Sequence, residues 1–359
     1  MNSILHYIQS LLHFNPTDRV WQFPFFAGFS VGLVLLVSLL FERIDLGLVG
    51  IIGAMSFVYT PNTPIYHRMA VVMCCSFGIT LSFSLGVLTH FFHFSIPLVV
   101  GIVALFSSIL VRYYDLGVPG YFFFVLACII GTFLPFPPRD FISLVGVVAL
   151  GTMAGNLAAL LYSLSVVYLF KNNPPHPVPV RGHLGFDKVV VDSLIMGTFV
   201  GLSMFIGQIL GLERSYWVAV SCTVIMQGIT LNSIWIKQGQ RILGTFIGMF
   251  LAFYLVNLNL SGFAFILLMM LLIFLGEFTV VRNYALAMVF FTPYATYLAE
   301  ASSLLNNPDV IIKARMIDVV VGSILGLLGG AVVHNQRLRV YFRRIARKVF
   351  RVNPNDGGV

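Results

Sequence analysis

A few ionisable side chains interrupt the long apolar runs of this sequence. Glu277 lies in LLIFLGEFTVVRNY, and Asp318 lies in KARMIDVVVGSILG. A charge at the centre of a membrane-spanning helix costs about 2.5–3.5 kcal/mol on insertion scales, so each such residue needs a partner or a function. A carboxylate in apolar surroundings can bind and release a proton near neutral pH. Glu277 and Asp318 are therefore candidate proton-coupling residues.

Each carboxylate also has a structural interpretation. Glu277 could be the ion-pair partner of an arginine on another helix. It precedes Arg282 by five residues, so the two side chains do not face each other on one helix. Asp318 follows Arg315 by three residues, a spacing that allows an ion pair within one helix. Asp192, near the start of another apolar run, is expected at the membrane interface.

Arginine side chains are the candidate anion-binding groups. Arg282 comes first, because a guanidinium offers a fork of donors that matches two carboxylate oxygens and keeps its charge. Arg241 and Arg112 are further candidates, and Arg68 would attract anions electrostatically, as Arg241 would. The alternative for an arginine at a helix end, such as Arg112, is a topological role in which it reaches the lipid headgroups.

Aromatic and amide side chains could complete a site for an aromatic anion. Trp217, Tyr284 and Tyr294 offer stacking faces, and the tyrosines add phenolic hydrogen bonds. Gln227 lies in the polar patch MQGITLNS, matched in position by TPNTP at 60–64. A broken helix end there would expose backbone groups to a polar cavity, whereas the simpler interpretation is a turn. Because aromatics form 14% of the chain, most of them must pack between helices or face lipid.

The elements that must position these side chains are membrane-spanning helices. Of the 359 residues, 58% are hydrophobic and 9% are charged, against about a quarter charged in soluble domains. The apolar residues form separate runs of about 17–25 residues, the length of a spanning helix, rather than the alternating strands of a barrel. The expected spans are 22–41, 45–60, 69–91, 95–112, 119–135, 141–170, 190–211, 215–232, 240–258, 262–281, 284–299 and 312–334.

The spans form two sets with matching landmarks. Equivalent residues recur in the same order at offsets of 169 to 176 residues. The matched pairs include Gly28 with Gly197, Glu42 with Glu213, Arg68 with Arg241, Arg112 with Arg282, and Gly146 with Gly322. We therefore predict an all-α membrane protein, a polytopic helical bundle of about twelve transmembrane helices in two same-orientation six-helix repeats. Glycines four residues apart, such as Gly28 and Gly32, are expected to bring helices close together.

The predicted domains follow from these repeats. An amphipathic interfacial segment occupies 1–18, the first repeat 19–170, a cytoplasmic linker 171–188, the second repeat 189–335 and a basic cytoplasmic tail 336–359. With both termini and the linker in the cytoplasm, sixteen of the 21 basic residues lie inside, as the positive-inside rule requires. The basic tail abuts a span, so anionic lipids of the inner leaflet are its expected partner and nucleic acid is not.

Several functional classes are disfavoured. The cysteines Cys74, Cys75, Cys128 and Cys222 lack the spacing of a metal site or a disulfide framework, so no metal and no cofactor are expected. No glycine–lysine nucleotide-binding loop occurs, so ATP hydrolysis by this chain is not expected. The apolar runs also offer no histidine-rich cluster and no acidic pair with metal spacing, and we do not expect an enzyme.

Motifs in the second half resemble a known family. They are ERSYWVAVSCTVIMQG from Glu213, KQGQRILGTFIGMFLA from Lys237, RNYALAMVFFTPYAT from Arg282 and RMIDVVVGSILG from Arg315. These motifs resemble the fusaric acid resistance (FUSC) family of bacterial inner-membrane transporters, which includes aromatic acid exporters. The resemblance implies efflux of a small organic anion, an aromatic or hydroxylated carboxylic acid, and allows a periplasmic adaptor protein as a partner. Family members commonly carry a large soluble region between their membrane halves, where this chain has only the short linker.

We therefore expect a proton-coupled secondary transporter that exports organic anions. A passive organic-anion channel, with arginines selecting the charge, is the first alternative. A membrane scaffold or lipid-handling protein without transport is the second. The sequence leaves open whether two chains form a homodimer.

Overall fold

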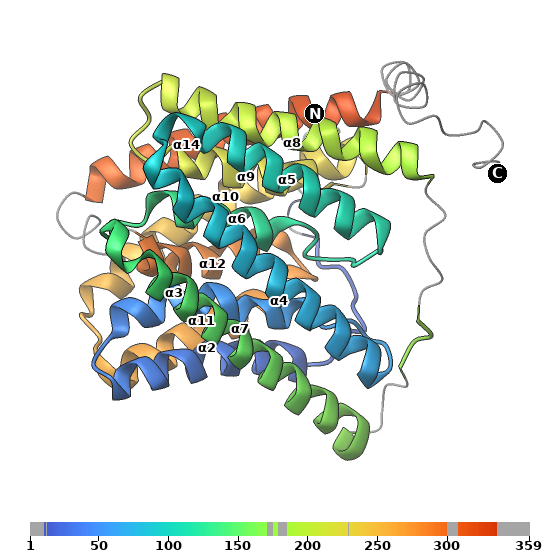
Figure 1. The fold of residues 1–359 in the computed structure, drawn as a ribbon, viewed down its shortest axis with the longest axis vertical. Helices are drawn as coiled ribbons and strands as arrows, with labels where there is room; N and C mark the ends of the chain where they lie inside the picture. Colours follow the sequence, from blue (N-terminus) through green and yellow to red (C-terminus); the bar gives the residue numbers. More distant parts are fainter. Residues whose placement is uncertain are drawn as a thin grey trace. The chain divides into compact units, whose positions relative to one another are not determined.

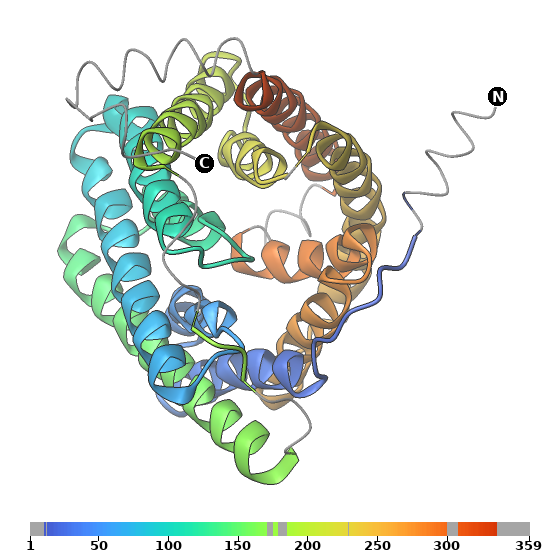
Figure 2. The same ribbon diagram turned by 90° about the vertical axis from the view of Figure 1, so that its right-hand side faces the viewer.

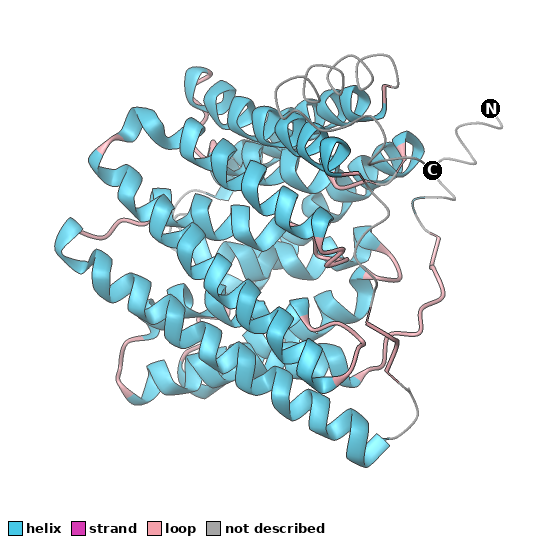
Figure 3. Ribbon diagram, turned by 45° about the vertical axis from the view of Figure 1, so that its right-hand side comes forward, coloured by secondary structure: helices cyan, strands magenta, loops and turns pink. Residues whose placement is uncertain are grey.

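The computed structural model describes residues 11, 13–170, 175–178, 185–228, 230–299 and 308–335, and every regular element within them is helical (Figure 3). The all-α prediction is thereby confirmed. The basic tail at 336–359 lies outside the described residues, as do most of the interfacial segment at 1–18 and most of the linker at 171–188.

The helices of the first half follow the predicted spans closely (Figure 1). They are α2 (Gln22–Leu40), α3 (Ile44–Ala54), α4 (Ile65–Leu88), α5 (Ile96–Tyr113), α6 (Phe122–Phe133) and α7 (Phe141–Leu164). A 3-10 helix, η1 (Met55–Tyr59), continues α3, and a π-helical turn, η5 (Ser165–Phe170), continues α7. Short 3-10 turns η2 (Thr89–Phe91), η3 (His93–Ser95) and η4 (Pro138–Asp140) lie between helices.

The second half repeats the same succession of helices. They are α8 (Phe186–Ile209), α9 (Tyr216–Met226), α10 (Leu231–Asn257), α11 (Gly262–Val280), α12 (Tyr284–Ala299) and α14 (Pro308–His334). Each of them overlaps one predicted span.

Long and short helices alternate in the same order in both halves. Within the described residues, eight helical segments of 19 to 32 residues are long and apolar enough to cross a membrane. The shorter apolar helices are α3 with η1, α6, α9 and α12, the second and fifth of each half. A helix of 11 residues is about 17 Å long, whereas the hydrocarbon core is about 30 Å thick. The short helices α3 and α9 therefore cover only part of that thickness.

The chain divides into two compact units that do not follow the order of the sequence. Unit 1 comprises Met1–Thr80, Phe136–His176 and Ile236–Val319, and unit 2 comprises Leu81–Pro135, Pro177–Trp235 and Val320–Val359. Unit 1 thus combines α2, α3 and α7 of the first half with α11 and α12 of the second. Unit 2 combines α8 and α9 of the second half with α5 and α6 of the first. Three of the five boundaries fall within α4, α10 and α14, and the other two lie between helices.

The helix pairs inside the two units correspond. In unit 1, α2 packs on α11 and on α3, and α11 packs on α12. In unit 2, α8 packs on α5 and on α9, and α5 packs on α6. Exchanging each helix for its counterpart in the other half converts the first set of pairs into the second. This correspondence agrees with the predicted two-repeat architecture, which remains a prediction.

Glycines set the close approach of these pairs. A Cβ on Gly28 would lie 2.8 Å from the carbonyl oxygen of Met270 on α11, and a Cβ on Gly201 would lie 2.8 Å from that of Pro97 on α5. The predicted close-packing role of the glycine pairs is confirmed, because each member would bring a Cβ within 3.0 Å of a neighbouring atom. These glycines are Gly28, Gly32, Gly197, Gly201, Gly244, Gly248, Gly322 and Gly326.

Candidate functional site

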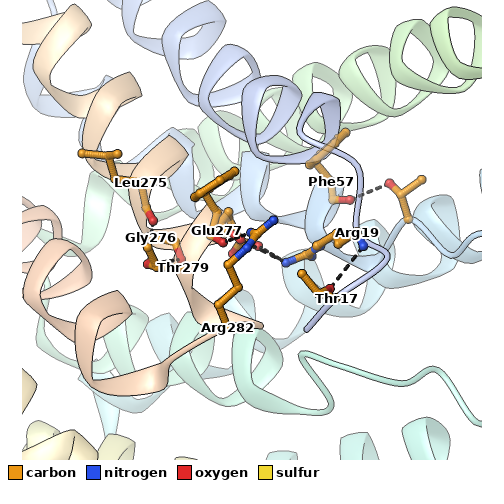
Figure 4. Close-up of polar contacts among 10 residues, drawn as sticks. Thr17, Arg19, Phe57, Leu275, Gly276, Glu277, Thr279 and Arg282 are labelled. Carbon is orange, nitrogen blue, oxygen red and sulfur yellow. Dashed lines mark hydrogen bonds and ion pairs between the residues drawn. The ribbon is translucent and has the colours of Figure 1, made fainter. Parts of the chain in front are cut away.

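Glu277 forms a buried ion pair in unit 1. Glu277 lies on α11 and is 4% exposed. Its Oε2 accepts a hydrogen bond from Arg19 Nη1 at 3.0 Å. Figure 4 shows the two side chains pointing toward each other, one from α11 and one from the segment before α2. The Arg19 guanidinium also lies 3.8 Å from the centroid of the Phe23 ring. Sequence analysis did not name Arg19, although a basic residue directly before the first apolar run was a usable signal.

A non-helical segment before α2 is fastened to the turn between α11 and α12 (Figure 2). We call residues 13–20 the N-terminal strap. The backbone N–H of Asn15 donates to the carbonyl of Arg282 at 2.8 Å. Asn283 Nδ2 lies 3.0 Å from the carbonyl oxygen of Leu11 and 3.1 Å from that of His13. The strap therefore positions Arg19 beside Glu277 through contacts with the residues that follow α11.

Arg282 turns back onto its own helix. Its Nη1 donates to the carbonyl of Phe278, and its guanidinium carbon lies 4.0 Å from the centroid of the Phe278 ring. A cation at this position satisfies a carbonyl at the end of α11 and interacts favourably with the negative end of the helix dipole. Its substrate-binding role is still a prediction.

Arg241 and Tyr284 lie together in unit 1. Arg241 is 3% exposed on α10, and its Nη1 donates to Tyr284 Oη at 3.0 Å. Lys237, one turn earlier on the same helix face, places its Nζ 5.3 Å from the centroid of the Tyr284 ring. Two cations one turn apart create a local positive potential, which favours an anion beside them. Sequence analysis missed Lys237, although the i, i+4 spacing in KQGQR is visible in the chain.

The other predicted side chains of unit 1 are buried. Tyr294 is 7% exposed on α12, and its hydroxyl has no hydrogen-bond partner in the described part of the chain. Asp318 and Arg315 are 1% and 2% exposed, one turn apart on α14. Their burial is compatible with either interpretation given above for Asp318.

Unit 2 contains a second ion pair, in which the acid is buried and the arginine is partly exposed. Arg112 Nη1, at the end of α5, lies 3.2 Å from Asp192 Oδ2 on α8. Asp192 is 2% exposed, and its side chain packs against α5. No ion-pair partner was predicted for Asp192, because nothing in its local pattern indicates which helix packs beside it.

Trp217 and Gln227 lie at the two ends of α9. Every residue from Trp217 to Met226 is buried, so this short helix is enclosed by protein on all sides. Gln227 Nε2 donates weakly to the carbonyl of Thr223 at 3.4 Å. Gly120 lies against the Gln227 amide, because a Cβ there would be 2.1 Å from Gln227 Oε1. These candidates belong to unit 2, whereas Glu277, Arg241, Arg282, Tyr284, Tyr294 and Asp318 belong to unit 1.

The counterpart of α9 in unit 1 is enclosed in the same way. Residues 49–60, from α3 through η1, are all buried. Arg68 follows at the start of α4, with Nε 2.5 Å from the carbonyl oxygen of Thr63 and Nη2 2.8 Å from Asn62 Oδ1. The TPNTP patch is therefore an ordered loop that is held by a buried arginine.

These features define a class of protein. Eight apolar helices of spanning length, with ionisable side chains buried among them, are those of a multi-pass α-helical membrane protein.

Comparisons with known proteins show what part of the chain is similar to. Residues 202–329 match the family model described as fusaric acid resistance protein-like. The chain is also 30% identical, over 166 residues, to the uncharacterized membrane protein YvaC of Bacillus subtilis. This match covers 46% of the chain and 26% of YvaC, so the chain corresponds to about a quarter of that relative. No solved structure matches. Over residues 202–329 the chain thus resembles the fusaric acid resistance protein-like family, in agreement with the resemblance of its motifs.

Proposed function

We propose that the protein is a secondary transporter that exports organic anions, aromatic or hydroxylated carboxylic acids, from the cytoplasm across the bacterial inner membrane. The observation that carries this proposal is the pair of short, enclosed helices, α3 with η1 and α9, in corresponding positions of the two halves. Interrupted helices in matched positions of two repeats are typical of transporter binding sites. The family match supports the same class.

The buried charges supply roles for such a transporter. Arg241, Lys237 and Tyr284 offer two cations and a hydroxyl, the groups that hold a carboxylate. We assign proton coupling to Glu277, because protonation of its carboxylate would release Arg19 from the ion pair. Asp318 is the second proposed proton-coupling residue. The remaining proposed substrate contacts are Arg282, Arg112, Trp217, Gln227 and Tyr294.

The architecture proposed with this function has about twelve spans in two six-helix repeats, with both termini in the cytoplasm. The short helices would complete that number without crossing the full hydrocarbon core. A periplasmic adaptor and a homodimeric assembly are compatible with this proposal. The protein would catalyse no chemical reaction.

Accumulation of aromatic acids in cells tests the proposal. Cells that express the wild-type protein should retain less of a labelled aromatic acid than the empty strain, across a panel of such acids. Glu277→Gln should restore the accumulation of the empty strain. Equal accumulation in all three strains for every acid would contradict export.

The driving force separates a carrier from a passive channel. In inverted vesicles, a carrier should show saturable benzoate uptake that collapses when a protonophore removes the proton gradient. Flux that is unsaturable and independent of the gradient would favour the channel.

A further inference from the structure

Arg68 has a hydrogen-bonding edge that the protein does not use. The residue is 1% exposed, one of the largest fully buried side chains of the molecule. Its Nε and Nη2 contact Thr63 and Asn62, which holds the loop after η1. Its Nη1 is buried and has no hydrogen-bond partner within the part of the chain that the structure describes. Because an unsatisfied buried nitrogen of a charged group is costly, a bound partner there is strongly favoured.

The charge of Arg68 has no carboxylate partner among the described residues. The ion pairs among the described residues place a carboxylate beside Arg19, Arg43, Arg112 and Arg139, and none beside Arg68. A guanidinium keeps its proton in proteins, because it is a far weaker acid than the other basic side chains. The positive charge of Arg68 is therefore best neutralised by a bound anion.

Aromatic side chains lie beside this guanidinium. The Tyr162 ring centroid is 5.8 Å from the guanidinium carbon of Arg68. Phe23 and Phe57 meet the same ring edge-on, with centroids 5.6 and 5.9 Å away. This aromatic cluster (Phe23, Phe57 and Tyr162) gives an apolar, polarisable surface next to a hydrogen-bond donor, a combination that suits an aromatic ring bearing a carboxylate.

We propose that Arg68 binds the carboxylate of an aromatic acid through Nη1, with the ring of the acid against the aromatic cluster. This site is separate from the Arg241 site and belongs to the loop that ends the enclosed helix α3–η1. The ligand class rests on the proposed function, whereas the anion-binding role of Arg68 rests on its contacts. Thr63 and Asn62 would fix the guanidinium so that little conformational entropy is lost on binding.

Equilibrium binding of radiolabelled benzoate to the full-length protein in nanodiscs tests the site. Arg68→Gln should weaken benzoate binding at least tenfold at one site per chain, and the Arg241 site should keep its affinity. The matched control is Arg43→Gln, which alters an exposed arginine of the same unit and should leave the affinity within twofold. Tyr162→Leu should weaken benzoate more than acetate, because only benzoate has a ring. Benzoate binding to Arg68→Gln with wild-type affinity would overturn the proposal.

Wild-type protein gives a test that does not depend on the folding of a variant. Unlabelled benzoate should displace the radioligand, whereas neutral benzamide should fail to do so at a hundredfold higher concentration. Displacement by benzamide as effective as by benzoate would overturn the proposal, as would a wild-type protein that binds no benzoate.

Transport by the same preparations separates this inference from the proposed function. Benzoate export that is intact in Arg68→Gln, together with unchanged binding, refutes the Arg68 site and leaves the transporter standing. Benzoate binding that requires Arg68, in vesicles that transport no carboxylate, supports the site and refutes the transporter.

Discussion

The α2–α11 pair of unit 1 and the α8–α5 pair of unit 2 pack in the same way, but their ion pairs are arranged differently. Both bring helices together over glycines, Gly28 and Gly201 among them. Both also contain one ion pair with a buried acid. In unit 1 the acid, Glu277, lies on α11, and its arginine comes from the strap; in unit 2 the acid, Asp192, lies on α8, and its arginine ends α5.

The two ion pairs differ in the kind of segment that carries the arginine. Arg112 and Asp192 are both carried by helices, so their separation is set by the α5–α8 packing. Arg19 is carried by the non-helical strap, which hydrogen bonds hold to the residues that follow α11. We therefore expect Glu277, whose arginine lies on the strap, to exchange a proton. We expect Asp192, whose arginine lies on a packed helix, to stabilise the fold.

Substitution of the contact glycines should disrupt the close helix packing that both pairs share. This is the largest effect that we expect. Gly28→Leu in unit 1 and Gly201→Leu in unit 2 both place side-chain atoms where backbone already lies, so folded protein should be lost. Fluorescence-detected size exclusion measures this loss. Gly146→Leu is the control, because a Cβ there meets nothing within 4 Å, and it should elute as wild type.

Neutralising the two acids should separate the pairs by function. Glu277→Gln should lower proton-driven benzoate flux at least tenfold while the protein remains folded. Asp192→Asn leaves Arg112 without its buried partner, so it should lower the thermal midpoint more than Glu277→Gln and leave the residual flux coupled to protons. Flux assays and melting of the same preparations check both outcomes. Equal loss of proton coupling in the two variants would contradict the different roles of Glu277 and Asp192.

Loss of the Asn283 side chain should loosen the strap and leave unit 2 unchanged. Asn283→Ala deletes two hydrogen bonds to the strap region, each of which contributes about 1 kcal/mol. Amide exchange across 13–20 should therefore accelerate at least fivefold, with the amides of α5 and α8 unchanged. Asn257→Ala, which removes an exposed asparagine from α10, is the control and should not alter exchange in the strap.

The smallest effect is expected at the exposed pair of Arg43 and Asp45. Their side chains are 55% and 49% exposed, so solvent screens their attraction. Arg43→Gln should leave both the melting midpoint and the benzoate flux within experimental error. A measurable fall in either would show that exposed charges matter as much as buried ones.

The sequence was a good guide to the helices and a poor guide to the partners of their charges. Apolar run length predicted each helix, because spanning a membrane imposes a period and a length on the local sequence. The four-residue glycine spacing likewise predicted close packing. By contrast, the Arg19–Glu277 pair joins residues 258 positions apart, and no local pattern encodes such a distance.

The candidate site shows the same limit. Arg241 with Tyr284 is a pair that sequence reasoning had named as separate candidates, and the structure joins them. Arg282 was the leading anion-binding candidate, yet its guanidinium contacts its own helix. Arg68 had been given only a weak electrostatic role, because the free Nη1 edge depends on how the loop at 60–64 folds around it.

The central claim is that the carboxylate of Glu277 exchanges a proton as an organic anion crosses the membrane. Proton movement driven by a benzoate gradient tests it most directly, in proteoliposomes that contain a pH-sensitive dye and either wild-type protein or Glu277→Gln. We expect a benzoate-dependent pH change with wild type and none with the variant. The same pH change with Glu277→Gln would contradict it.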